Sequence, residues 1–161
     1  MPIERQILLL EDDLIQTMLF RAAVDGVLGT VMNFTDVSDA FTIMQRSRID
    51  LCVVDLGIFT HPGVFHEEGG NRFITQVRRD VSRTTPIIVA TSGRKPESLI
   101  ASFRAGADDY VLKDEGLNKV IDRIRIWISE LPIQEHQLDA KRARILKFLE
   151  NAQKNKLDLP E

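Results

Sequence analysis

Residues 7–13 read Ile-Leu-Leu-Leu-Glu-Asp-Asp, an uninterrupted apolar run of strand length followed directly by three acids. Such a run is typical of a strand that is covered on both faces, as the strands of a parallel sheet are. From Leu14 to Ala23 apolar residues recur at helical spacing, and Gly26 lies near the expected end of that helix. The chain therefore begins with a strand–helix unit that has acids at the carboxyl end of its strand.

The same alternation of strand and helix repeats four more times along the chain. Further strands are expected at 30–34, 51–54, 87–90 and 110–112, and further helices at 37–44, 73–81, 96–105 and 117–131. Strands that alternate with helices predict a parallel sheet with helices on both faces. Asp13 is expected to cap the first helix, and Asp36 or Ser38 the second. The segment 57–71 is rich in glycine and proline and is expected to be a long loop.

Beyond Pro132, which marks the end of the fifth helix, apolar residues from Leu138 to Ala152 again follow a helical spacing. The expected organisation is one α/β domain over residues 1–131 and a helical extension over 132–161. This amphipathic helix could pack on its own domain or dimerise the protein.

The composition of the 161-residue chain, 43% hydrophobic with a net charge of −3, is that of one globular domain. Its apolar runs are far shorter than the roughly 20 residues of a membrane span, so no membrane association is expected, and its N-terminus is too polar for a secretory signal. Without a strongly basic balance, direct nucleic-acid binding is not expected. Cys52 is the only cysteine, which excludes an intrachain disulfide and fits a cytoplasmic location.

Ligands of open parallel sheets bind beyond the carboxyl ends of the strands, and polar side chains gather there in this sequence. They are Glu11, Asp12, Asp55, Thr91, Ser92 and Lys113. Carboxylates brought together repel one another unless a cation is bound, and Mg²⁺ binds carboxylate, water and phosphate oxygens. A carboxylate can also attack phosphorus and form an aspartyl phosphate. A lysine and a threonine hydroxyl can then bind the phosphoryl oxygens.

Four blocks, in this order, resemble the receiver domain of two-component response regulators over residues 5–131. They are Leu-Leu-Leu-Glu-Asp-Asp (8–13), Val-Val-Asp (53–55), Val-Ala-Thr-Ser-Gly (89–93) and Ala-Gly-Ala-Asp-Asp-Tyr-Val-Leu-Lys (105–113). The resemblance implies a flavodoxin-like, doubly wound sheet of five parallel strands in the order 2-1-3-4-5. Five helices would cover this sheet, and the extra C-terminal helix would be added to them.

The resemblance also implies that Asp55 accepts a phosphoryl group from a histidine kinase or a phosphotransfer protein. Asp12 would bind Mg²⁺ directly and Glu11 through water, while Asp55 and the backbone carbonyl of Gly57 would complete the protein ligands. On this interpretation the chain is not an enzyme, apart from phosphorylating and dephosphorylating itself.

The resemblance assigns the remaining strand-end residues to a switch. Thr91 and Lys113 would bind the phosphoryl group, Ser92 would keep the site accessible, and Tyr110 would rotate inward when Thr91 moves. The surface of the fourth helix, fifth strand and fifth helix would then change its binding to a downstream protein. A homodimer could form through the face of the fourth and fifth helices or through the C-terminal helix.

Two features depart from the family pattern. The segment 57–71 is longer than usual and could cover the site, slow hydrolysis or bind a partner. Asp114 replaces a proline that the family usually has in a cis peptide, so this peptide bond is either trans or strained. Its charge could also weaken the interaction of Lys113 with phosphate.

Other interpretations stay open. Glu11 and Asp12 could cap a helix, Thr91 and Ser92 could cap a turn, and Asp55 could simply end its strand before a turn. Lys113 could be a surface lysine at a strand end, and Tyr110 could belong to the core. The rival functions are a degenerate receiver that binds partners without phosphorylation and, less favoured, an aspartyl-phosphate phosphatase. The acid that such a phosphatase needs two residues after its nucleophile is absent, since that position is glycine.

A transition-metal site of His61, His66, Glu67 and Glu68 fits no regular ligand spacing. Cys52 and Trp127 are expected in the core.

Overall fold

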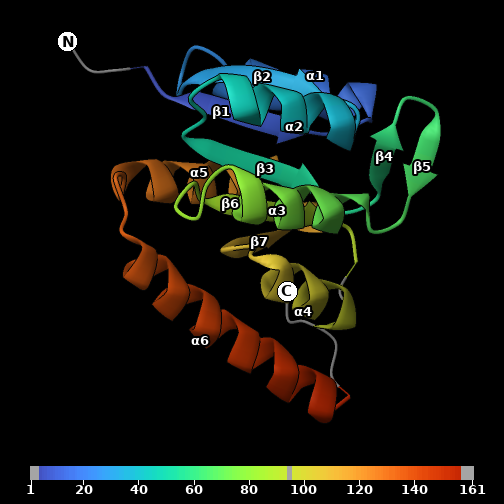
Figure 1. Ribbon diagram of the computed structural model, residues 1–161, viewed down its shortest axis with the longest axis vertical. Coiled ribbons are helices and arrows are strands. Elements are labelled where there is room, and N and C mark those ends of the chain that lie inside the picture. Colours follow the sequence, from blue (N-terminus) through green and yellow to red (C-terminus); the bar gives the residue numbers. More distant parts are fainter. Residues whose placement is uncertain (1–3, 94–95, 157–161) are drawn as a thin grey trace.

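Five strands form one parallel sheet in the computed structural model, which describes residues 4–93 and 96–156 (Figure 1). They are β1 (Gln6–Leu10), β2 (Thr30–Phe34), β3 (Leu51–Asp55), β6 (Ile87–Thr91) and β7 (Asp109–Leu112). Their order is β2-β1-β3-β6-β7, and each neighbouring pair is parallel. The predicted order 2-1-3-4-5 is confirmed, because the two short strands numbered β4 and β5 lie outside this sheet.

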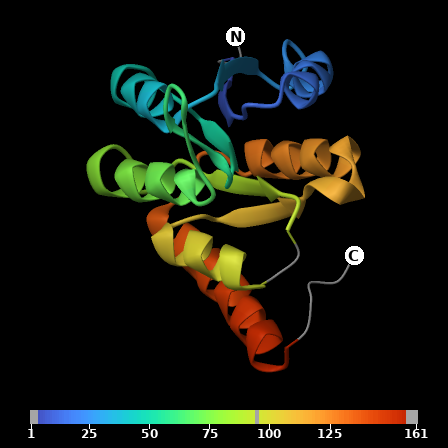
Figure 2. The ribbon, with the colours of Figure 1, turned by 90° about the vertical axis from the view of Figure 1, so that its right-hand side faces the viewer.

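Helices cover both faces of the sheet, as Figure 2 shows. The helices α1 (Leu14–Val24) and α5 (Leu117–Ser129) lie on one face, and α2 (Val37–Arg46), α3 (Gly69–Asp80) and α4 (Pro96–Ala105) lie on the other. None of these helices, nor any other in the described part of the chain, has the length and apolar character that crossing a membrane requires.

The apolar strands divide their side chains between these two faces. In β1, Ile7 and Leu9 pack in a cluster with α1 and α5, whereas Leu8 and Leu10 pack in a cluster with α2, α3 and α4. Successive side chains of a strand point to opposite faces, so a strand that is covered on both faces must be apolar at every position. Cys52 is fully buried in the second of these clusters, as expected of a small core residue.

Two of the predicted helix caps are confirmed. The Asp13 carboxylate accepts a hydrogen bond from the backbone N–H of Gln16 at 2.9 Å, and the Asp36 carboxylate accepts one from Asp39 at 2.9 Å. Asp36 rather than Ser38 is therefore the cap of α2. Asp13 caps α1, and its role therefore differs from that of the two preceding acids, Glu11 and Asp12.

The prediction of an irregular loop over 57–71 is wrong. The segment contains an antiparallel hairpin of β4 (Ile58–His61) and β5 (Val64–His66), and α3 begins at Gly69. The rings of Phe59 and Phe65 meet across the hairpin in a T-shaped contact, with their centroids 5.7 Å apart. Short apolar runs on both sides of a Pro-Gly pair are a hairpin signal, but the surrounding glycines obscured it.

The C-terminal helix α6 (Glu135–Lys154) packs on its own domain, which is one of the two alternatives that the sequence left open. It crosses α4 and lies beyond β7 in Figure 1. Leu138 is fully buried in the cluster of α1 and α5, and Leu149 is fully buried in the cluster of α2, α3 and α4. The helix therefore contributes to the cores on both faces, at the edge of the sheet that β7 forms.

Candidate functional site

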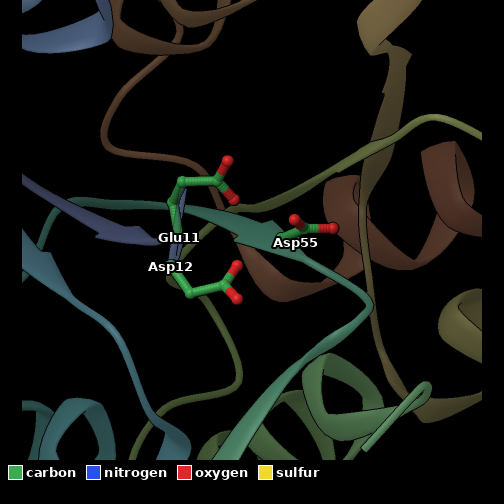
Figure 3. Close-up of side chains that lie close together, drawn as sticks. All are labelled: Glu11, Asp12 and Asp55. Carbon is green, nitrogen blue, oxygen red and sulfur yellow. The ribbon is translucent and has the colours of Figure 1, made fainter. Parts of the chain in front are cut away.

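Three carboxylates converge where β1 and β3 end. Glu11 and Asp12 follow β1, and Asp55 is the last residue of the neighbouring β3, in which Val54 pairs with Leu10 of β1. One carboxylate oxygen of each acid lies within 4.8 Å of those of the other two (Figure 3). Adjacent parallel strands end at the same edge of a sheet, so the strand register brings these acids together.

Lys113 reaches the same point from the end of β7, across β6. Its Nζ donates hydrogen bonds to Asp55 Oδ2 at 2.9 Å and to Glu11 Oε1 at 3.1 Å. The lysine side chain is largely buried, and it faces three carboxylates with a single positive charge. The site thus retains an excess of negative charge that a cation would balance.

Burial shapes the protonation of this cluster. Glu11 is only 3% exposed, and desolvation raises its pKa to about 8, an effect that Asp55 reinforces and Lys113 opposes. Burial alone would lower the pKa of Lys113, but its hydrogen bond to Asp55 and the two nearby carboxylates raise it overall. The neighbouring carboxylates therefore favour the charged form of Lys113.

Thr91, Ser92 and Gly57 line one pocket with Asp55, of about 370 Å³. Thr91 is the last residue of β6 and Ser92 follows it, whereas Gly57 lies two residues after Asp55. The Thr91 hydroxyl accepts a hydrogen bond from the backbone N–H of Gly93 at 3.2 Å, and Ser92 is exposed. The site residues predicted at the strand ends are therefore gathered around Asp55.

Tyr110 lies apart from the acidic cluster. It is half-buried in β7, and its ring makes a T-shaped contact with Phe103 of α4 at 6.2 Å. It packs against the cluster that α2, α3 and α4 cover, together with Ile145 of α6. Tyr110 therefore contacts α4 rather than the carboxylates.

The peptide bond between Lys113 and Asp114 is trans, because the one cis peptide bond among the described residues joins Leu131 to Pro132. Lys113, Asp114 and Glu115 form one short 3-10 turn, η1 (Lys113–Glu115). Of the two alternatives that the sequence left open for Asp114, the trans peptide is the observed one.

Two glycines that the sequence analysis assigned to a loop hold α3 against the site. A Cβ atom on Gly70 would lie 2.3 Å from the carbonyl oxygen of Asp55, and one on Gly69 would lie 2.6 Å from that of Ile58. The Gly70 N–H donates to the Leu56 carbonyl at 2.9 Å. The first turn of α3 therefore packs directly on the backbone that carries Asp55, an approach that only glycine allows.

The residue types in the cluster fit a hard divalent cation. All three acids offer oxygen ligands, which Mg²⁺ and similar ions prefer over nitrogen or sulfur. Glu11, Asp12 and Asp55 form the only group of three or more such ligands found within 4–93 and 96–156. The segment with His61, His66, Glu67 and Glu68 is not among such groups, in agreement with its irregular spacing. Glu67 and Glu68 instead line the pocket around Asp55.

Comparison with known proteins gives a consistent family. The response regulator receiver domain matches residues 7–125. Two curated relatives are the transcriptional regulatory protein BasR of Escherichia coli, 29% identical over 122 residues, and the response regulator protein PmrA of Pseudomonas aeruginosa, 30% identical over 120 residues. Each alignment covers 74% of this chain, and the chain spans about half the length of these relatives, 50% and 51% respectively.

Solved structures share the fold. A putative response regulator from Chloroflexus aurantiacus has a TM-score of 0.68 at 21% identity, covering 79% of this chain and 99% of that one. The phosphorylated cyanobacterial phytochrome response regulator RcpA has a TM-score of 0.62 at 19% identity, covering 80% and 93%. At these identities the similarity establishes the fold, which is the flavodoxin-like one expected from the sequence.

The close approach of α3 can be tested by substitution of Gly70 by alanine. The added methyl group meets backbone atoms of Asp55 and Leu56, which cannot move without displacing β3 or α3. We expect Gly70→Ala to lower the free energy of unfolding by about 1–3 kcal/mol, the usual cost of overpacking. Urea denaturation measures this change in the free energy of unfolding. Gly93→Ala is the matched control, since its Cβ would meet only Thr91 Oγ1 at 3.7 Å; equal stability of both variants would contradict the argument.

Proposed function

Because the chain belongs to the receiver domain family of two-component response regulators, we propose that it is phosphorylated on Asp55 by a histidine kinase or a phosphotransfer protein. The observation that carries this proposal is the pair of hydrogen bonds from Lys113 to Asp55 and Glu11, with Asp12 beside them. This arrangement places a nucleophilic carboxylate next to a fixed positive charge and a set of cation ligands. Those are the parts that phosphoryl transfer to a carboxylate requires.

In the proposed transfer, a carboxylate oxygen of Asp55 forms a bond to phosphorus while the bond from phosphorus to the donor breaks. With a phosphohistidine donor the broken bond is P–N, and its electron pair returns to the imidazole nitrogen. Lys113 would bind a phosphoryl oxygen as a charged donor, and the Thr91 hydroxyl would donate to another after leaving its contact with Gly93. Water then hydrolyses the acyl phosphate, so the chain needs no enzymatic activity toward a separate substrate.

We assign Mg²⁺ to Asp12, Asp55 and the carbonyl of Gly57, with Glu11 acting through water. Bound there, the ion would neutralise charge on the transferred phosphoryl group. Support comes from the all-oxygen ligand set and from its excess of negative charge. The burial of Glu11 adds to this, because a buried acid without a cation is costly to ionise.

We propose that phosphorylation shifts the equilibrium between two conformations of the surface formed by α4, β7 and α5. Thr91 would move toward the phosphoryl group, and Tyr110 would move into the space beside it. The contact of Tyr110 with Phe103 supports this route, because it joins α4 to β7, the strand that Lys113 follows. A downstream protein would recognise the shifted surface.

A protein donor needs a docking surface close to Asp55, and we propose that it uses α1. Four large apolar side chains of this helix are more than half exposed, namely Leu14, Ile15, Met18 and Leu19. Leu19 also lines a cavity of about 240 Å³ that Asp55 and Lys113 line as well. Exposed apolar patches of this kind mark protein interfaces, and the net charge of −3 favours protein partners over nucleic acid.

Incubation with Mg²⁺ and a small phosphodonor such as acetyl phosphate tests the assignment of Asp55. We expect intact-protein mass spectrometry to show one added, base-labile phosphoryl group on the wild type and none on Asp55→Asn. Asp13→Asn is the matched control, because it removes an acid outside the cluster and asparagine caps helices equally well. A base-labile phosphoryl group on Asp55→Asn would refute the assignment, and a wild type that gains none would favour the degenerate receiver.

Because the carboxylates of the cluster repel one another, we expect that removing one of them raises stability in the absence of a cation and weakens cation binding. In EDTA we expect Asp12→Asn to be more stable than the wild type by about 1 kcal/mol, since a charge that repels the neighbouring Asp55 carboxylate is removed. Added Mg²⁺ should stabilise the wild type, because only the folded state binds it, and should have little effect on Asp12→Asn.

Thermal unfolding with and without Mg²⁺ measures both effects. Asp13→Asn again serves as control, and it should respond to Mg²⁺ as the wild type does. A wild type that Mg²⁺ leaves unchanged, or an Asp12→Asn that it stabilises equally, would contradict the assignment of the ion to this cluster.

A further inference from the structure

The helix α6 occupies part of the surface through which the proposed switch would act. It packs along α4 and lies beside β7, so that one side of the α4–β7 surface is covered by the chain itself. Figure 1 shows the helix crossing this region at an angle. The exposed part of the surface is a groove between α5, β7 and α6, which Tyr110, Trp127 and Phe148 line.

A buried ionic contact anchors the first half of α6. Arg142 donates from Nη2 to Asp108 Oδ1 at 2.8 Å and from Nε to the carbonyl of Ala107 at 3.1 Å. Asp108 is fully buried just before β7. Its second oxygen accepts hydrogen bonds from Arg78 of α3 at 2.6 Å and from the backbone N–H of Ile87 at 2.9 Å.

Apolar contacts anchor the second half of α6 on α4. Leu149 is fully buried and Ala152 is 7% exposed, while Ile145 and Leu146 pack against the same cluster as Phe103 of α4. An exposed ion pair between Arg104 and Glu150, at 3.3 Å, adds to this contact. An amphipathic helix that packs its apolar side on another helix in this way uses the same contacts as a helical ligand in a groove.

The docked helix packs against the same cluster as Tyr110, which the proposed switch moves. Tyr110, Phe103 and Ile145 belong to one packed cluster, with the Tyr110 and Phe103 rings in edge contact. A tightly packed contact tolerates little change in shape. A displacement of Tyr110 toward Thr91 therefore alters the surface on which Ile145 rests.

The anchor is built so that it can be released. When Arg142 leaves, Asp108 keeps its hydrogen bonds from Arg78 and Ile87, so no buried charge is left without a partner. Arg142 regains water and keeps the partner on its own helix, Asp139, at 3.3 Å. Leu138, by contrast, is buried at the start of α6 beside α5 and holds that end in place.

We propose that α6 is an intramolecular ligand of the α4–β7 surface, and that phosphorylation of Asp55 weakens the docking of the part of α6 that follows Leu138. This inference rests on the proposed function. In the unphosphorylated protein α6 withholds the surface from other proteins. After phosphorylation the surface accepts instead a partner helix with a comparable apolar stripe.

Hydrogen–deuterium exchange of the full chain tests this, with Mg²⁺ and beryllofluoride as the phosphoryl mimic. We expect backbone amides of residues 145–154 to exchange about tenfold faster after beryllofluoride is added, while amides of α2 stay unchanged. Asp55→Asn should show no such effect. Arg142→Gln should exchange faster in this segment even without beryllofluoride, whereas Lys147→Gln, which removes an exposed charge from the same helix, should match the wild type.

The outcomes separate the two proposals. If beryllofluoride increases protection around Thr91 but leaves residues 145–154 unchanged, the docking proposal is overturned and the proposed function stands. If beryllofluoride changes exchange nowhere in the wild type, the proposed function fails, and the docking proposal fails with it. Arg142→Gln with wild-type exchange in residues 145–154 would also overturn the docking proposal, because the contact with Asp108 would then not hold this part of the helix.

Discussion

The convergence of three carboxylates on one lysine is the constraint around which this molecule is organised. Glu11, Asp12 and Asp55 repel one another, and Glu11 is buried where its charge is costly. Lys113 compensates only in part, through hydrogen bonds to two of the three. Such an arrangement is unfavourable for stability alone. Under the proposed function, the excess of negative charge is what a bound cation would balance.

The strands and helices around this cluster hold its members in place. The register of β1 with β3 sets the acids next to one another, and the four-strand span from β1 to β7 brings in Lys113. The glycine pair at 69–70 lets α3 rest on the Asp55 backbone. On the far side, α6 lies beyond the β7 edge and contributes apolar side chains to both cores.

Much of this could be predicted from the sequence, because buried parallel strands leave continuous apolar runs and the residues that end them are easily found. The two caps and the grouping of Glu11, Asp12 and Asp55 follow from that pattern, whereas the strand order is implied by the resemblance to receiver domains. The hairpin was missed because its strands are short and flanked by glycines. The anchoring role of Asp108 could not be predicted, since it depends on Arg78 and Arg142 approaching from distant helices.

The account is tested most directly by a crystal structure of the protein with Mg²⁺ and beryllofluoride. We predict the ion bound to carboxylate oxygens of Asp12 and Asp55 at about 2.0–2.1 Å. The beryllofluoride group should be attached to Asp55, within hydrogen-bonding distance of Lys113 Nζ. An ion held elsewhere, or beryllofluoride on any other carboxylate, would contradict the account.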